Sequence, residues 1–141
     1  MPTVSASTEL AATQDTVWAL ISDFSRYGEW NETHTGFPDG TPELAEGASY
    51  LENVRIMGMP GQVKWTVTEV QEPSRLRLDG AGPMGIALGQ VLELAASGDG
   101  TTVSLQTSFA GGPLAGPMGV AVAQAGEKAA AASLQKLKAM L

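Results

Sequence analysis

The chain has 141 residues, of which 43% are hydrophobic and 16% are charged, and its formal net charge is −7. This length and composition predict a single domain, residues 1–141, large enough for a core and for a cavity within it. Its eight lysine and arginine residues are scattered along the chain. A phosphate backbone selects clustered basic residues, so the charge pattern excludes nucleic acid as the expected partner.

The chain contains no cysteine. Disulfides, thiolate metal sites and cysteine nucleophiles are therefore excluded together. The first ten residues lack the basic start and the apolar stretch of a secretory signal. No apolar run reaches the roughly 18 residues that a membrane-spanning helix needs. We therefore predict a cytoplasmic protein without stable membrane insertion.

The N-terminal part predicts one strand followed by two short helices. Residues 4–10 alternate between two faces, one of them polar, which is typical of a half-buried strand. Thr13 is placed to cap a helix with an apolar stripe, and residues 24–30 predict a second helix that Gly28 keeps short. The stretch 31–47 is rich in Thr, Gly, Pro and acidic residues and predicts a loop.

Five strand-like segments follow the loop. They lie at residues 48–57, 63–70, 75–79, 86–96 and 102–109, with turns predicted at 59–61, 72–74, 80–85 and 97–100. Short turns imply antiparallel neighbours, hence a meander rather than a parallel sheet. In the first segment the alternation does not decide which face points inward. The inward face carries either Tyr50 and Glu52 or Asn53 and Arg55.

The C-terminal segment predicts one long helix. Gly116 and Pro117 place a proline at a helix start, where its missing N–H leaves no helical bond unmade. The residues from there to Leu141 are rich in Ala, Lys, Gln and Leu, and at about 1.5 Å per residue they would form a helix of roughly 37 Å. We predict an α+β fold in which a curved antiparallel sheet of about six strands surrounds this helix.

A sheet that curves around a helix encloses space, and side-chain volume decides whether that space is filled. The middle of the predicted helix, residues 121–132, consists largely of alanine and glycine, whereas the strands carry medium-sized leucines and valines. Small helix residues lead either to close contact between helix and sheet or to a cavity. The residue pattern leaves both outcomes open.

Several short motifs occur in an order that resembles the START-like helix-grip superfamily, which includes bacterial polyketide cyclase/dehydrase and lipid-transport proteins and plant Bet v 1 allergens. They are Asp15-Thr-Val-Trp-Ala-Leu-Ile-Ser-Asp23, Tyr27-Gly-Glu-Trp30, Trp65-Thr-Val-Thr-Glu-Val70 and Glu72-Pro73. The resemblance covers nearly the whole chain and implies a helix-grip fold with a pocket. Gly58-Met-Pro-Gly61 and Gly112-Pro-Leu-Ala-Gly-Pro-Met-Gly119 also resemble an actinobacterial branch, some of whose members carry a toxin name.

The candidate ligand contacts combine an apolar lining with a few polar side chains. The apolar and aromatic candidates are Trp30, Trp65, Leu78, Met84, Leu88, Leu92, Phe109, Met118 and Val122, and the polar ones are His34, Tyr50, Gln90 and Thr107. Gln90 and Thr107 lie on otherwise apolar inward faces. A buried Gln needs partners, so Gln90 either bonds locally or contacts the ligand.

Catalytic chemistry has little support in the sequence. His34 is the only histidine, and it can titrate near neutrality. No second histidine and no cysteine exists to build a triad, and one histidine with dispersed carboxylates makes no zinc site. We therefore predict no metal and no cofactor.

Three functions remain as hypotheses. The first is binding or carriage of a small hydrophobic molecule, lipid- or polyketide-like. The second is an enzyme of cyclase or dehydratase type in which His34 or a tyrosine supplies the proton. The third, which follows from the resemblance, is a toxin of a toxin–antitoxin pair that acts through protein interaction.

Overall fold

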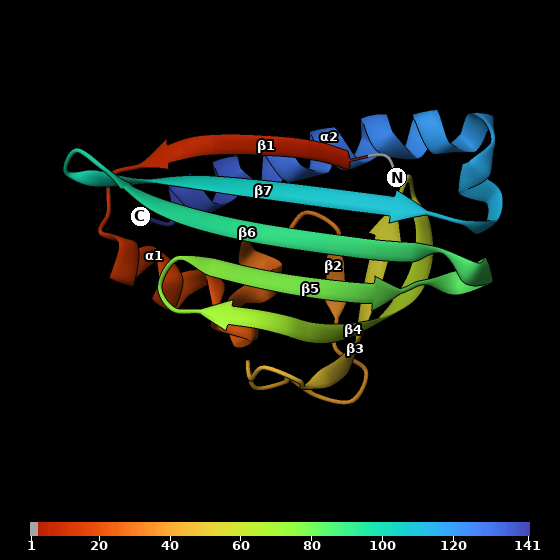
Figure 1. Cartoon of the computed structure of the whole chain (residues 1–141), viewed down its shortest axis with the longest axis horizontal. Coiled ribbons are helices and arrows are strands. Elements are labelled where there is room, and N and C mark those ends of the chain that lie inside the picture. The colour runs from red at the N-terminus through yellow and green to blue at the C-terminus, as the bar shows by residue number, and fades with distance from the viewer. Residues whose placement is uncertain (1–2) are drawn as a thin grey trace.

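The computed structural model describes residues 3–141 and contains one curved sheet of seven antiparallel strands (Figure 1). The strands are β1 (Thr3–Leu10), β2 (His34–Gly36), β3 (Ser49–Ile56), β4 (Met59–Gln71), β5 (Arg75–Ala81), β6 (Ala87–Ser97) and β7 (Gly100–Ala110). Their order across the sheet is β1-β7-β6-β5-β4-β3-β2. The helices are α1 (Gln14–Ile21) and α2 (Pro117–Ala139), with 3-10 turns η1 (Phe24–Glu29), η2 (Pro83–Gly85) and η3 (Gly112–Ala115).

This architecture confirms the predicted α+β fold of a curved antiparallel sheet around a long C-terminal helix. In Figure 1, α2 runs behind β1 and β7 along most of their length, and β3 and β4 bend back toward it. A register shift between Val67 and Glu69 on β4 marks a bulge, which bends and twists the strand locally. The sheet therefore curves around the helix instead of lying flat against it.

The sheet has seven strands because a short strand forms inside the predicted loop 31–47. This strand, β2, pairs with β3 through His34 opposite Val54 and Gly36 opposite Asn53. Three residues are too few for an alternation pattern to be recognised. The strand forms because the edge of β3 offers unpaired backbone groups.

The turn between β3 and β4 lies at Met57 and Gly58, so the predicted turn at 59–61 was wrong. Both residues have positive φ, 56° and 77°, as a two-residue type I′ hairpin turn requires. Pro60 suggested a break, but the last pair between β4 and β5 is Lys64 with Ala81. Beyond it β4 has no neighbour on that side, so the missing N–H of proline interrupts no ladder bond.

The N-terminal helix begins as predicted. The Thr13 side chain accepts a hydrogen bond from the backbone N–H of Thr16 at 3.3 Å, which caps α1. The buried stripe of α1 packs against the concave side of the sheet together with η1 and the C-terminal half of α2. There Leu134 and Leu137 of α2 are fully buried. This end of the molecule forms the main hydrophobic core.

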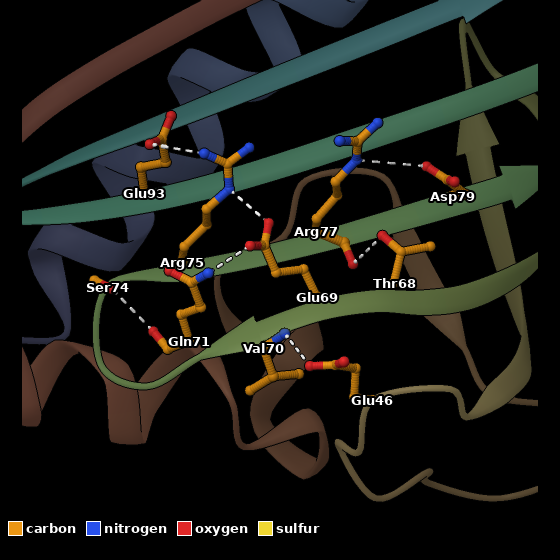
Figure 2. Close-up of polar contacts among 10 residues, drawn as sticks. All are labelled: Glu46, Thr68, Glu69, Val70, Gln71, Ser74, Arg75, Arg77, Asp79 and Glu93. Atoms are coloured by element: carbon orange, nitrogen blue, oxygen red, sulfur yellow. Dashed lines mark hydrogen bonds and ion pairs between the residues drawn. The ribbon is translucent and has the colours of Figure 1, made fainter.

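The inward face of β3, left open by the sequence, is the one that carries Glu52 and Val54. Both side chains are buried, Tyr50 is half-buried, and Arg55 on the other face is exposed. On the outer face of β4, β5 and β6, charged and polar side chains form a solvent-facing network (Figure 2). Within it Arg75 pairs with Glu69 at 2.9 Å and with Glu93 at 3.5 Å. Such exposed pairs contribute little to stability and keep this face soluble.

Gly80 on β5 provides room for the Trp65 ring. A Cβ atom at position 80 would lie 2.7 Å from the ring carbons of Trp65 and 2.9 Å from Val63 Cγ1. We expect Gly80→Ala to destabilise the protein by about 1–3 kcal/mol, as overpacking does in other cores. Gly36→Ala is the control, because nothing lies within 4 Å of its Cβ position. Equal urea-unfolding midpoints for the two variants would contradict the expectation.

Candidate functional site

A cavity of about 580 Å³ lies between the concave face of the sheet and the middle of α2. Strands β3, β4, β6 and β7 contribute most of the sheet side, and the residues 122–133 contribute the helix side. The apolar lining consists of Val54, Ile56, Met57, Val63, Trp65, Leu88, Leu105, Phe109, Val122, Ala125, Ala129, Ala130 and Ala132. The polar residues at its wall and mouth are Asn31, Glu32, Thr33, Thr35, Glu52, Arg55, Gln90, Thr107, Lys128 and Ser133.

Small residues on α2 produce both outcomes that the sequence left open. Toward β1 the helix packs closely, because the Cβ position of Gly126 is 3.5 Å from Val4 Cγ2 and 3.6 Å from Phe109 Cε1. Toward β3, residues such as Ala125 and Ala129 are too short to reach the sheet, and the cavity remains. One face of the helix thus packs against the sheet, and the neighbouring face lines the cavity.

A buried carboxylate forms the polar part of the cavity wall. Glu52 is 3% exposed, and its two oxygens are held separately. Oε1 accepts a hydrogen bond from Trp65 Nε1 at 2.8 Å, and Oε2 lies 2.7 Å from His34 Nδ1. A carboxylate oxygen has capacity for a second donor, so Glu52 can also receive a hydrogen bond from a molecule in the cavity.

Aromatic rings fix the imidazole of His34 behind Glu52. Its ring centroid lies 4.5 Å from that of Phe37 and 5.1 Å from that of Tyr27, the latter in a T-shaped contact. Phe24, Tyr50 and Trp30 also belong to this cluster of rings. The imidazole is therefore held with Nδ1 toward the carboxylate, and it does not itself line the cavity.

The loop before β2 is attached to α2 at one edge of the cavity. The backbone N–H of Glu32 donates to Ser133 Oγ at 2.9 Å, and the Glu32 carboxylate pairs with Lys136 at 2.5 Å. Asn31 Oδ1 accepts hydrogen bonds from the backbone N–H and the hydroxyl of Thr33. The two contacts of Glu32 tie the helix to the sheet edge, and the one with Ser133 spans 101 residues of sequence.

The whole chain, residues 1–141, matches the family model described as polyketide cyclase / dehydrase and lipid transport. The chain therefore belongs to this family. Among its relatives, the Mycobacterium tuberculosis protein named Toxin Rv0910 is 31% identical over 112 residues, which cover 79% of this chain and 78% of the relative. The protein named Uncharacterized protein Rv1546 from the same organism is 30% identical over 119 residues, which cover 81% and 83%.

Solved structures of other bacterial proteins share this fold. A START superfamily protein from Mycobacterium smegmatis superposes with a TM-score of 0.75 at 22% identity, covering 98% of this chain and 95% of that one. A protein from Chromobacterium violaceum gives a TM-score of 0.72 at 14% identity, with 98% and 95% covered. The resemblance to the START-like helix-grip superfamily is thereby confirmed at the level of the fold.

Six of the thirteen predicted contact residues line the cavity of this family member: Trp65, Leu88, Gln90, Thr107, Phe109 and Val122. The structure places the other seven elsewhere. Trp30, Leu78 and Leu92 are buried in the main core, His34 lies behind Glu52, and Tyr50 packs within the ring cluster. Met84 and Met118 are exposed, at 73% and 47%. Ligand contact by any of the thirteen stays a prediction.

Several polar residues at the cavity were not among the predicted contacts. Glu52 could have been predicted from the alternation of β3, because it lies on the same face as Tyr50 and Val54. Ser133 and Lys128 lie on the cavity side of α2, but alanine surrounds them in sequence and obscures the helix faces. Asn31 belongs to a stretch without any periodic pattern.

Within residues 3–141, no group of three or more His, Asp or Glu side chains is arranged to hold a metal ion. No helix in the same range is long and apolar enough to cross a membrane.

Both tyrosines of the chain are neutral at pH 7. Burial raises the pKa of Tyr27 well above its usual range, and the nearby charge of Glu52 adds to this shift. Burial and the Glu52 charge raise the pKa of Tyr50 in the same direction. The ionised phenolate is disfavoured because it would leave water and approach a like charge.

We expect the tyrosines to make folding stability fall in alkaline solution. An unfolded tyrosine titrates near pH about 10, and the folded protein keeps those protons to higher pH. The stability from the neutral phenols is therefore complete below pH about 10 and declines as pH rises through the raised folded values. Urea unfolding across this range, with the variant Tyr50→Phe showing a weaker decline than the parent, checks this. Tyrosinate absorbance that appears near pH 10 without unfolding would contradict it.

Proposed function

We propose that this protein binds and carries a small hydrophobic molecule, lipid- or polyketide-like, in the cavity between sheet and α2. The observation that carries the proposal is the cavity itself, about 580 Å³ in volume and lined mainly by apolar side chains. Ligand sites in proteins have volumes of roughly 300–1,000 Å³, with a few placed polar groups among apolar ones. The family description, which includes lipid transport, supports the same function.

The polar groups of the cavity restrict the ligand further. Gln90 and Thr107 lie directly opposite each other on β6 and β7, both line the cavity, and neither side chain makes a hydrogen bond within residues 3–141. Glu52 supplies an acceptor at another wall. A mainly apolar molecule with a hydroxyl toward Glu52 and a carbonyl or hydroxyl toward Gln90 would satisfy all three.

Ala129→Trp tests the site of binding. The indole would occupy the space between α2 and the sheet, so we expect the affinity for a hydrophobic ligand to fall by more than about tenfold. Ala131→Trp is the matched control, because Ala131 is exposed on the same helix and does not line the cavity. Binding is measured by native mass spectrometry over a panel of lipids and polyketides. Unchanged affinity in Ala129→Trp would remove the cavity as the site.

An enzyme of cyclase or dehydratase type is the second candidate, because Glu52 gives the cavity a buried carboxylate paired with an imidazole. Such a pair can accept a proton from a bound molecule and return it, as a general acid–base catalyst does. Incubation with an unsaturated or poly-keto ligand would then yield a dehydrated or cyclised product. We expect Glu52→Gln to abolish that product while binding persists, since glutamine keeps an acceptor for Trp65. A ligand recovered unchanged from the parent protein rules the enzyme out for that ligand.

A role in a toxin–antitoxin pair is the third candidate. Its support is the name Toxin carried by a relative at 31% identity. Co-purification of the full chain with the product of an adjacent small gene would favour this role, and recovery of the chain alone would count against it.

A further inference from the structure

Exposed apolar side chains gather at one end of this molecule. Large hydrophobic residues that remain 45% to 73% exposed are Met57, Met59, Met84, Met118, Val120 and Leu141. All except Leu141 lie on three neighbouring segments: the β3–β4 turn, η2, and the start of α2 with η3 before it. We call this set of five residues the methionine end.

The sheet topology brings these three segments together. The last residue of β5, Ala81, pairs with the first of β6, Ala87, which also pairs with the last of β7, Ala110. The η2 backbone lies directly against Gly112 of η3, and β4 begins at the same end. In Figure 1 the β3–β4 hairpin and the start of α2 lie at the right, whereas the C-terminus lies at the left.

Backbone geometry sets two of these methionines apart. Within residues 3–141, Met57 and Met84 are the two non-glycine residues with positive φ, 56° and 59°. Glycine or asparagine adopts this conformation with less strain. Neither methionine is buried, so neither compensates for its strain by filling the core. Core packing therefore does not explain an apolar side chain at either turn, and a functional role for the strained position is indicated.

Charge separates this end from the rest of an acidic protein. The segments 55–64, 80–88 and 108–126, from which the end is built, contain none of the 15 acidic residues. Asp79 directly precedes the second segment and lies 3.9 Å from Arg77 on the outer face of the sheet. Arg55 and Lys128 flank it, are exposed, and take part in no ion pair among the described residues. Glu127 is the acidic residue beside Lys128, and it does not line the cavity. The N-terminus of α2 adds the positive end of a helix dipole.

Exposed residues line the cavity along the gap between β3 and α2, from Glu32 and Thr35 beside β2 to the hairpin at the methionine end. Arg55, Met57 and Gly58 line it from the β3–β4 hairpin, and Val122 and Lys128 line it from α2. A molecule that leaves the cavity between the hairpin and the helix therefore passes Met57 of the methionine end.

We propose that the methionine end docks reversibly on a lipid bilayer that contains anionic phospholipids, so that the ligand passes between bilayer and cavity. This rests on the proposed function, since it makes the cavity ligand a membrane-soluble molecule. Flexible, unbranched methionines can enter the headgroup region, while Arg55 and Lys128 face lipid phosphates. The lack of acidic side chains in the segments that form this end makes an anionic bilayer the occupant that fits its charge.

The test is flotation of the purified full chain with vesicles of phosphatidylcholine alone or mixed with phosphatidylglycerol. We expect binding to the mixed vesicles that weakens as salt rises. Combining Met59→Asp with Met118→Asp should weaken it by at least about tenfold, because a charge replaces each inserted side chain. Leu141→Asp is the matched control, since Leu141 has similar exposure at the opposite end, and it should bind as the parent does.

Met84→Asn separates docking from folding. Asparagine tolerates positive φ better than methionine, so the urea midpoint should rise while vesicle binding falls. For the cations, Lys128→Glu should weaken binding to the mixed vesicles, whereas Lys138→Glu, near the opposite end of α2, should leave it unchanged. Equal binding by the double aspartate variant and the parent would overturn the proposal. So would binding that is lost equally in Leu141→Asp.

Uptake of a neutral fluorescent probe, N-phenyl-1-naphthylamine, distinguishes this inference from the proposed function. Met59 and Met118 do not line the cavity, so the double variant should still take up the probe. If the parent takes up the probe but does not bind vesicles, membrane docking is wrong and ligand binding in the cavity is supported. If the parent binds vesicles but takes up no probe, ligand binding in the cavity is contradicted instead. The molecular mass in solution tests a second copy of the chain as the occupant. A dimer that forms in the parent and is lost in the double variant would also overturn the proposal.

Discussion

The concave face of the sheet is wider than one helix can fill, and the other features of the structure follow from this mismatch. The helix α2 lies against β1 at Gly126, so the space left over opens on the side of β3. Near the C-terminus the leucines of α2, together with α1 and η1, fill that space with the main core. In the middle of the helix, alanine leaves it as a cavity of about 580 Å³. One helix therefore fills the space near its C-terminus, the filled end, and leaves a cavity beside its middle, the hollow end. Beyond the cavity, Val4, Phe109 and Leu114 form a second, smaller buried cluster.

The carboxylate of Glu52 shows what the hollow end requires. A buried charge is unfavourable unless donors replace the lost water, and here Trp65 and His34 supply them. Each donor depends on a further contact, since Gly80 leaves room for the Trp65 ring and Phe37 packs against His34. Buried ion pairs often stabilise a fold no better than apolar residues of the same volume would. The cluster is therefore better explained by the polarity that it gives the cavity than by stability.

Local patterns predicted most of the fold, because alternation and helix starts are properties of neighbouring residues. The strands with clear alternation and the proline-started helix lie where the sequence placed them, with differences of a few residues at their ends. Strand β2 and the turn at Met57 could not be predicted in this way. The first depends on the free edge of β3, and the second depends on a strained methionine where asparagine or glycine is usual.

The candidate site was harder to predict for a different reason. Alternation identified which side chains face inward, and Gln90, Phe109, Leu78 and Leu92 all do so. Whether an inward side chain meets core or cavity depends on which part of α2 lies opposite, and that is a tertiary property. Leu92 faces the filled end, while Gln90, two residues earlier on the same strand, faces the hollow one. A periodicity of two cannot distinguish these positions.

The division between a filled and a hollow end also determines how a ligand can enter. An entrance through the filled end would have to separate large side chains that interdigitate, which is unfavourable. At the filled end, Leu134 and Leu137 anchor α2 in the core. At the hollow end the helix presents alanine to the cavity, and the β3–β4 turn ends in exposed methionines. A ligand that enters between the hairpin and α2 leaves the contacts of these leucines intact, so binding need not compete with folding.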